Sequence, residues 1–199
     1  MQDDEAGGVG LRLNQLGQCV DERLSGRARR HRDDSLRQTC IDVLCAYLRL
    51  PFLPDPGTAD LKNHHLYLAL REVRHTILRL IGDHYRRPEG THHSWQGCDL
   101  DLTGVTIDGN MDFSDATFTR GTVTFAGATI SGSTVSFDRA AMSGGTVAFG
   151  RTAISGGTVF FGGVTFSGGM LDFSDATGPV PTGLLAAVSS PVPTTVILP

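Results

Sequence analysis

The chain has 199 residues, 40% of them hydrophobic and 19% charged, so it can bury the core of one ordinary domain or two small ones. Its net charge of −4 and isoelectric point near 5.9 argue against a protein that binds nucleic acid by neutralising phosphates. Glycine is in excess, because 25 glycines make up about 13% of the chain against a usual ~7%.

The sequence lacks the features of a membrane-spanning, secreted or metal-binding protein. No apolar run is long enough to span a membrane, and the acidic N-terminus has neither the basic start nor the apolar stretch of a signal peptide, so we expect a cytoplasmic protein. The four cysteines are scattered without a CxxC pair, which predicts free thiols. The doublets His64-His65 and His92-His93 have no further ligand at a metal-site spacing, so we expect no metal and no cofactor.

The first 94 residues predict a short helical region. Residues 1–34 combine a dense charge cluster with a short mixed apolar stretch, and we expect them to be poorly ordered or weakly helical. Residues 35–94 carry apolar side chains at steps of three and four in two stretches, which end at Pro51 and Pro88 and predict two amphipathic helices. The expected inner face of the second helix consists of Leu66, Leu70, Val73, Ile77, Ile81 and Tyr85.

Arginines are frequent on this second helix, which raises the question of a phosphate-binding face. Acidic side chains, Glu72 and Asp83, lie among them. We therefore interpret them as a solvated helix surface rather than as a binding site. The residues concerned are Arg71, Arg74, Arg79, Arg86 and Arg87.

A repeat of twelve residues organises the segment 95–178. Its most regular column is phenylalanine, at Phe113, Phe125, Phe137, Phe149, Phe161 and Phe173. A second large apolar side chain follows five residues after each of the first five, at Phe118, Ile130, Met142, Ile154 and Phe166. Each repeat therefore divides into two units of five residues and a spacer of two, and the first and third residues of a unit are apolar, except at Thr152.

Apolar residues two positions apart point to the same side of an extended segment, so each unit predicts a very short strand with two inward side chains. Glycines between the units supply corners, as in Gly144-Gly145 and Gly156-Gly157. The expected fold is mainly β, a solenoid whose coils stack at ~4.8 Å. A coil of twelve residues and one of twenty-four both fit the repeat; we favour twenty-four, with four sides and about 3.5 coils, because twelve residues enclose too little space for four inward side chains.

Units such as Val135–Arg139 and Ala128–Gly132 resemble pentapeptide repeats, here in a twelve-residue variant with a two-residue spacer. The stretches Arg37–Arg49 and Ser94–Gly97 resemble the region that precedes the repeats in actinobacterial pentapeptide-repeat proteins, and the use of 16 arginines against one lysine suggests a GC-rich genome. The resemblance covers about residues 35–178 and implies a right-handed quadrilateral β-helix preceded by a small α-helical region. Relatives often have N-terminal transmembrane helices, and this chain has none, so residues 1–34 are a candidate for a truncated or diverged start.

The ends of the solenoid must be covered, because they expose unpaired strand edges. We expect the helices of residues 35–94 to cap the first coil. The tail, residues 179–199, is rich in proline and then apolar. It predicts either a second cap or a strip through which the chain forms a homodimer.

Three functions remain open at this level, and all are non-enzymatic because no nucleophile motif or phosphate loop is present. The first is a scaffold that binds another protein, with the outward Phe160, Asp112, Asp115 and Asp138 as candidate contacts. The second is a DNA-mimicking inhibitor of an enzyme such as DNA gyrase, which the resemblance suggests; the acidic candidates are Asp99, Asp101, Asp108, Asp112, Asp115, Asp138, Asp172 and Asp175. The third is a ligand-ordering surface on the ladder Thr122, Thr134, Thr146 and Thr158, which is interpreted more simply as a turn position.

Overall fold

The computed structural model describes residues 33–52, 54–91, 93–187 and 196–198. The predictions made for residues 1–32 and for residues 188–195 and 199 of the tail lie outside the described residues. The chain divides into two compact units, Met1–Thr39 and Cys40–Pro199. In the first unit residues 33–39 are helical, and Arg37 pairs with Asp34 at 3.3 Å.

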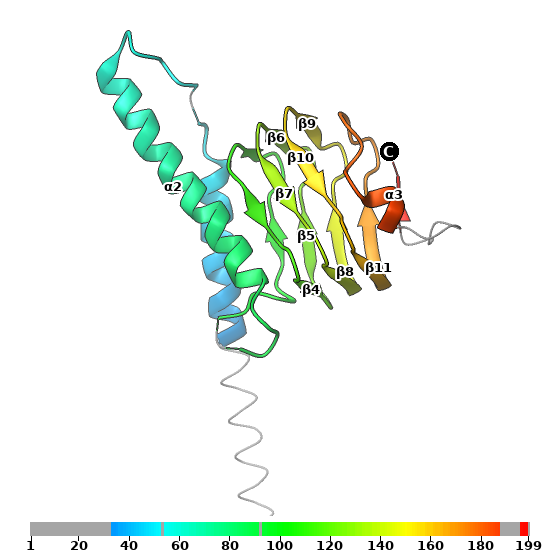
Figure 1. Cartoon of the computed structure of the whole chain (residues 1–199). Helices are drawn as coiled ribbons and strands as arrows, with labels where there is room; N and C mark the ends of the chain where they lie inside the picture. Colours follow the sequence, from blue (N-terminus) through cyan, green and yellow to red (C-terminus); the bar gives the residue numbers. More distant parts are fainter. Residues whose placement is uncertain (1–32, 53, 92, 188–195, 199) are drawn as a thin grey trace, which may run out of the picture. The chain divides into compact units, whose positions relative to one another are not determined.

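The second unit begins with helical residues 40–49, a proline-containing connection and helix α2 (Leu61–Tyr85). The side chain of Asp60 caps α2 by accepting a hydrogen bond from the backbone N–H of Asn63 at 3.2 Å. Pro51 and Pro88 lie just beyond the two helices, where a missing N–H and a fixed φ oppose continuation. The predicted helical region is confirmed, and it precedes the β-structure (Figure 1).

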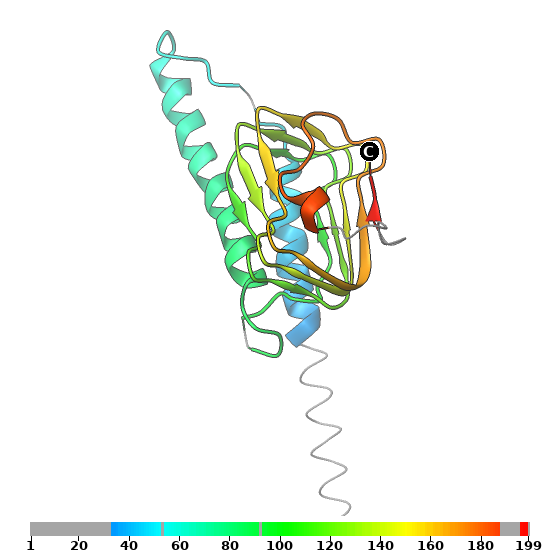
Figure 2. The same cartoon turned by 45° about the vertical axis from the view of Figure 1, so that its right-hand side comes forward.

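Only half of the expected inner face of α2 is buried. Ile77, Ile81 and Tyr85 are buried, as expected. Leu66, Leu70 and Val73 are 56%, 41% and 46% exposed, so the prediction is wrong for them. The reason is length, since α2 extends beyond the edge of the coil that it covers, and its buried residues begin only at Arg74 (Figures 1 and 2).

In the residues that the structure describes, twelve short strands and one short helix follow. Their bounds are β1 Leu100–Asp101, β2 Thr106–Ile107, β3 Met111–Asp112, β4 Thr117–Phe118, β5 Thr122–Thr124, β6 Thr129–Ser131, β7 Thr134–Ser136, β8 Ala141–Ala148, β9 Ala153–Ser155, β10 Thr158–Phe160, β11 Thr165–Asp172, α3 Leu184–Ala187 and β12 Val196–Ile197. The named strands pair in parallel, in the orders β1-β5-β8-β11-β12, β2-β6-β9 and β3-β7-β10, and β4 pairs with β8. The result is a parallel β-solenoid of about four turns.

Strand register decides the length of a coil. Val123 pairs with Val147, and Val135 pairs with Val159, so stacked residues are 24 positions apart. One half of β8 pairs with β4 and the other half with β5, so β8 passes round a corner and the coil has four sides (Figure 2). The coil of twenty-four residues is confirmed, and the sequence repeat of twelve corresponds to half a coil.

Phenylalanine rings stack through the interior in two columns, each ring lying on the ring of the next coil. In one column, Phe137 lies 5.0 Å from both Phe113 and Phe161, centroid to centroid. In the other, Phe149 lies 4.6 Å from both Phe125 and Phe173. The columns meet edge to face, as between Phe137 and Phe149 at 6.0 Å, and both arrangements are favourable for aromatic pairs. All six rings are fully buried.

A turn at a corner of the coil begins at each phenylalanine of these columns. The backbone N–H of the residue three positions on donates to its carbonyl, for example from Ala140 to Phe137 at 3.0 Å. The residue before that donor has a positive φ, which is +64° at Gly163 but +55° at Arg139 and +58° at Arg151. A type II turn requires this conformation and favours glycine there. Non-glycine residues therefore hold a strained backbone at Asp115, Arg139, Arg151 and Asp175.

The described part of the tail packs on the last coil. Val196 pairs with Leu171 in β11, and Thr182 pairs with Phe160. Leu184 is fully buried and Val196 is 7% exposed. Of the two expectations for the tail, these residues support the cap.

Truncation of a central ring tests the stacking. We expect Phe137→Ala to lower the free energy of unfolding by about 3–5 kcal/mol, because it removes one ring from between two others and leaves a cavity. Phe160→Ala, at a partly buried outward position, is the matched control and should cost less. Equal losses in urea unfolding of the two variants would contradict the inward assignment.

Relief of the strained corner should stabilise the chain. Arg151→Gly is expected to raise the free energy of unfolding by about 1 kcal/mol, because a left-handed conformation costs an L-residue about 1–2 kcal/mol and glycine recovers part of it. Arg151→Ala keeps the strain and controls for the loss of the side chain. Equal melting temperatures of the two variants would contradict the assignment of backbone strain at position 151.

Candidate protein-interaction surface

Arginines of the helices bind carboxylates of the first coil. Arg49 pairs with Asp101 at 3.0 Å, and Arg86 pairs with Asp112 at 2.8 Å. Arg71 approaches Asp108 at 3.7 Å. The contact between Arg86 and Asp112 lies where α2 meets β3, and a Cβ on Gly82 of α2 would come within 2.5 Å of the Asp112 carbonyl oxygen. Helix and coil are therefore in direct backbone contact there, as expected of a cap.

Arg74 is buried at this junction, so its interpretation as part of a solvated helix surface is wrong. Its side chain is 3% exposed and donates to the carbonyls of Leu48 at 2.9 Å and Thr106 at 2.8 Å. The guanidinium also lies 4.9 Å from the centre of the Phe52 ring and 3.9 Å from Asp108. One arginine thereby links the first helix, the connection and the coil.

The four residues predicted as protein contacts lie on one side of the solenoid, around the sheet of β3, β7 and β10. We call this surface the β3–β7–β10 face. Asp112, Ser136 and Phe160 are in register on adjacent strands, so they form one outward row. Asp138 lies two residues beyond Ser136, and Asp115 occupies the corner after β3. Phe160 is partly buried rather than fully exposed.

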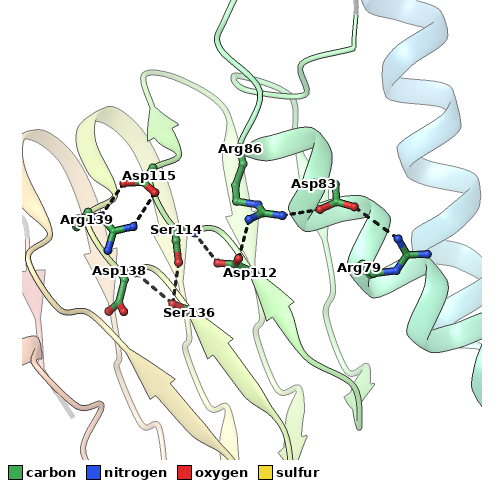
Figure 3. Close-up of polar contacts among 9 residues, drawn as sticks. All are labelled: Arg79, Asp83, Arg86, Asp112, Ser114, Asp115, Ser136, Asp138 and Arg139. Atoms are coloured by element: carbon green, nitrogen blue, oxygen red, sulfur yellow. Dashed lines mark hydrogen bonds and ion pairs between the residues drawn. The ribbon is translucent and has the colours of Figure 1, made fainter.

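A chain of polar contacts crosses this face from α2 to the second coil (Figure 3). Asp83 of α2 binds Arg86, which binds Asp112. Asp112 accepts from the backbone N–H of Ser114 at 2.9 Å, and the hydroxyls of Ser114 and Ser136 lie 3.0 Å apart. The Ser136 hydroxyl in turn accepts from the backbone N–H of Asp138 at 3.3 Å.

Asp115 and Arg139 form an ion pair on this face with two hydrogen bonds. Two guanidinium nitrogens of Arg139 donate to the two carboxylate oxygens, each at 2.8 Å (Figure 3). This two-point hydrogen bonding by Arg139 lowers the pKa of Asp115 below its usual value, and Asp115 in return raises the pKa of Arg139. Both side chains are mostly exposed, so the pair contributes little to stability and mainly orients two charges on the surface.

A hollow of about 450 Å³ lies between α2 and the edge of this face. Both acidic and basic side chains line it, so their charges largely balance. They are Glu72, His75, Thr76, Arg79, Asp83, Arg86, Asn110 and Asp112. Within the described ranges, no three His, Cys, Asp or Glu side chains gather as metal ligands would.

The eight carboxylates proposed for DNA mimicry do not form a row of free charges. Asp101, Asp108, Asp112 and Asp115 pair with arginines. Asp99, Asp138 and Asp172 accept hydrogen bonds from the backbone N–H groups of Thr122, Gly162 and Ser174. Asp175 is exposed at a strained corner.

The threonine ladder is also not one surface. Thr122 pairs with Thr146, and Thr134 pairs with Thr158, in two different sheets. Residues twelve apart lie half a coil from each other, so the four threonines divide between opposite sides of the coil. The hypothesis of a single threonine ladder as a ligand-ordering surface is wrong for that reason.

Arg139 and Arg86 belong to this surface. Sequence reasoning did not name Arg139, and it interpreted Arg86 as part of a solvated helix surface, whereas Arg86 binds Asp112. For Arg139 a signal existed, because it follows Asp115 by 24 residues, which is one coil. For Arg86 there was none, since its contact with Asp112 depends on how α2 docks.

No protein-family model matches the chain, and no match was found among curated proteins or among solved structures. In the part of the chain that the structure describes, no helix is both long enough and apolar enough to cross a membrane.

Removal of Arg74 tests the junction. Arg74→Leu is expected to lower the free energy of unfolding by about 3 kcal/mol, because it leaves two carbonyls and Asp108 without their buried partner. Arg71→Leu removes a half-exposed arginine from the same helix and should change stability by less than about 1 kcal/mol. Urea denaturation of both variants checks this, and similar losses would contradict the assignment.

Proposed function

We propose that this chain is a non-enzymatic scaffold of the pentapeptide-repeat type that binds a partner protein through its β3–β7–β10 face. The observation that carries the proposal is the gathering of Asp112, Asp138 and Phe160 with the Asp115–Arg139 pair on one side of a rigid solenoid. A stack of short parallel strands presents such side chains at fixed spacings of ~4.8 Å, so little ordering is needed on binding.

Membership of the pentapeptide-repeat class is supported by the four-sided coil and by the inward side chains of each five-residue unit. Phe137 and Val135 are both fully buried within one unit, while Ser136 and Asp138 between and after them face outward. The two-residue spacer lengthens a coil from the twenty residues of four units to twenty-four.

The chemistry of the face favours a protein partner over a mimic of DNA. Hydroxyls, paired charges and one aromatic ring suit a mixed polar and apolar surface, and aromatic and arginine side chains are typical of protein interfaces. A DNA mimic of an enzyme such as gyrase needs a row of free carboxylates, and here Asp112 and Asp115 are bound by arginines.

A photo-crosslinking residue on each side of the coil tests the proposal. Benzoylphenylalanine at position 160 should label a specific protein in lysate of the source organism, whereas the same residue at Ala148 should not. Ala148 is the matched control, because it precedes Phe160 by twelve residues and so occupies the corresponding place on the opposite side.

Competition with the unlabelled chain gives the second readout. The wild-type chain and Ala148→Arg should suppress labelling, but Ser136→Arg should not, because it places a large charge in the middle of the row. Labelling that is equal from positions 148 and 160, or that Ser136→Arg suppresses fully, would overturn the proposal.

A further inference from the structure

The side of α2 that faces solvent carries an apolar stripe. Leu66, Ala69, Val73 and Leu80 are exposed at steps of three, four and seven, and the partly buried Thr76 completes the spacing. At 1.5 Å per residue the stripe is about 21 Å long. Leu66, Val73 and Leu80 are 56%, 46% and 36% exposed, which is unusual for large side chains in one row.

This stripe is separate from the surface that caps the solenoid. Leu78 is fully buried and nine residues from Ala69, which places the two on opposite sides of a helix with about 100° between successive residues. Contact through the stripe would therefore leave the buried Ile81, Tyr85 and Arg74 as they are.

The spacing is that of a coiled-coil seam, with Leu66, Val73 and Leu80 at a positions and Ala69 and Thr76 at d positions. We propose that a second copy of this chain binds here, with the two α2 helices antiparallel. An antiparallel pair places a positions opposite d positions, so Val73 faces Thr76 of the second copy and Ala69 faces Leu80 of the second copy. The small Ala69 of one copy then opposes the large Leu80 of the other, in the layers that flank the two central ones.

The charges beside the stripe favour a second copy of this chain as the partner and an antiparallel direction of its helix. Glu72 and Arg79 occupy g positions beside the stripe, and Arg79 has a side chain that is 66% exposed. In the register above, Glu72 of each copy lies beside Arg79 of the other, which gives two opposite-charge contacts. In a parallel pair the g positions lie beside e positions of the other helix, so Glu72 would approach Ile77 and find no opposite charge.

A membrane surface suits the stripe less well. Helices that lie in a lipid interface carry mainly basic residues beside the apolar side chains. Here Glu72 and Asp83 flank the stripe together with Lys62 and Arg79. The mixture of signs favours a self-complementary protein contact.

Sedimentation velocity of the full chain tests the proposal, with circular dichroism to verify folding. The wild type should be a dimer. Val73→Glu should raise the dimer dissociation constant about a hundredfold, because it buries a charge without a partner in the seam. Leu68→Glu is the matched control: Leu68 is 43% exposed on the same helix but lies outside the stripe, so this variant should remain a dimer.

Charge exchange tests the antiparallel register. Glu72→Arg and Arg79→Glu should each weaken the dimer about tenfold, because each places like charges beside one another twice. The double variant, Glu72→Arg with Arg79→Glu, should restore wild-type affinity.

Three results would overturn the proposal. One is a monomeric wild type, and another is a Val73→Glu dimer as strong as that of the wild type, which would point to the C-terminal tail instead. The third is a double charge variant no stronger than the single ones. None of these measurements depends on the partner of the β3–β7–β10 face, so the two proposals can fail separately.

Discussion

The stacking of one coil on the next is the interaction on which the rest of this structure depends. Strand pairing at a distance of 24 residues satisfies the backbone of each coil, and the same distance brings Phe137 onto Phe113 and Phe161. Neither contribution suffices alone, because strands of two or three residues offer few hydrogen bonds and an isolated coil cannot bury its rings. The strained corners at Asp115 and Arg139 follow from this constraint, since the chain must turn at the same place in every coil.

The arrangement of side chains on the surface follows from the way the interior residues stack. Once inward residues stack at a fixed period, outward residues one coil apart become neighbours, and Asp115 meets Arg139 in this way. The β3–β7–β10 face is therefore a lattice of positions whose contents can vary without disturbing the core. Such a division suits a binding scaffold, because the outward Ser136 or Phe160 can change while Val135 and Phe161 keep the coil intact.

The helical region contributes two surfaces of different kinds. One side of α2 packs against the first coil through Leu78, Gly82 and Tyr85, and the buried Arg74 extends this contact to the carbonyls of Leu48 and Thr106. The opposite side keeps an apolar stripe in contact with solvent. A helix that served only as a cap would need only the first of these surfaces, and the second is what a dimer would use.

Local pattern by itself determined the inward residues of the repeats, the corners that glycine occupies, the parallel solenoid and the two helices, because alternation of side chains, proline and glycine act within a few residues along the chain. It also named Asp112, Asp115, Asp138 and Phe160 as outward. Only the tertiary structure decided that Thr122 and Thr134 lie on different sides, that Arg74 is buried and that Arg86 binds Asp112. Those contacts join segments that are distant in sequence, and they depend on how whole elements dock, which periodicity within one element does not encode.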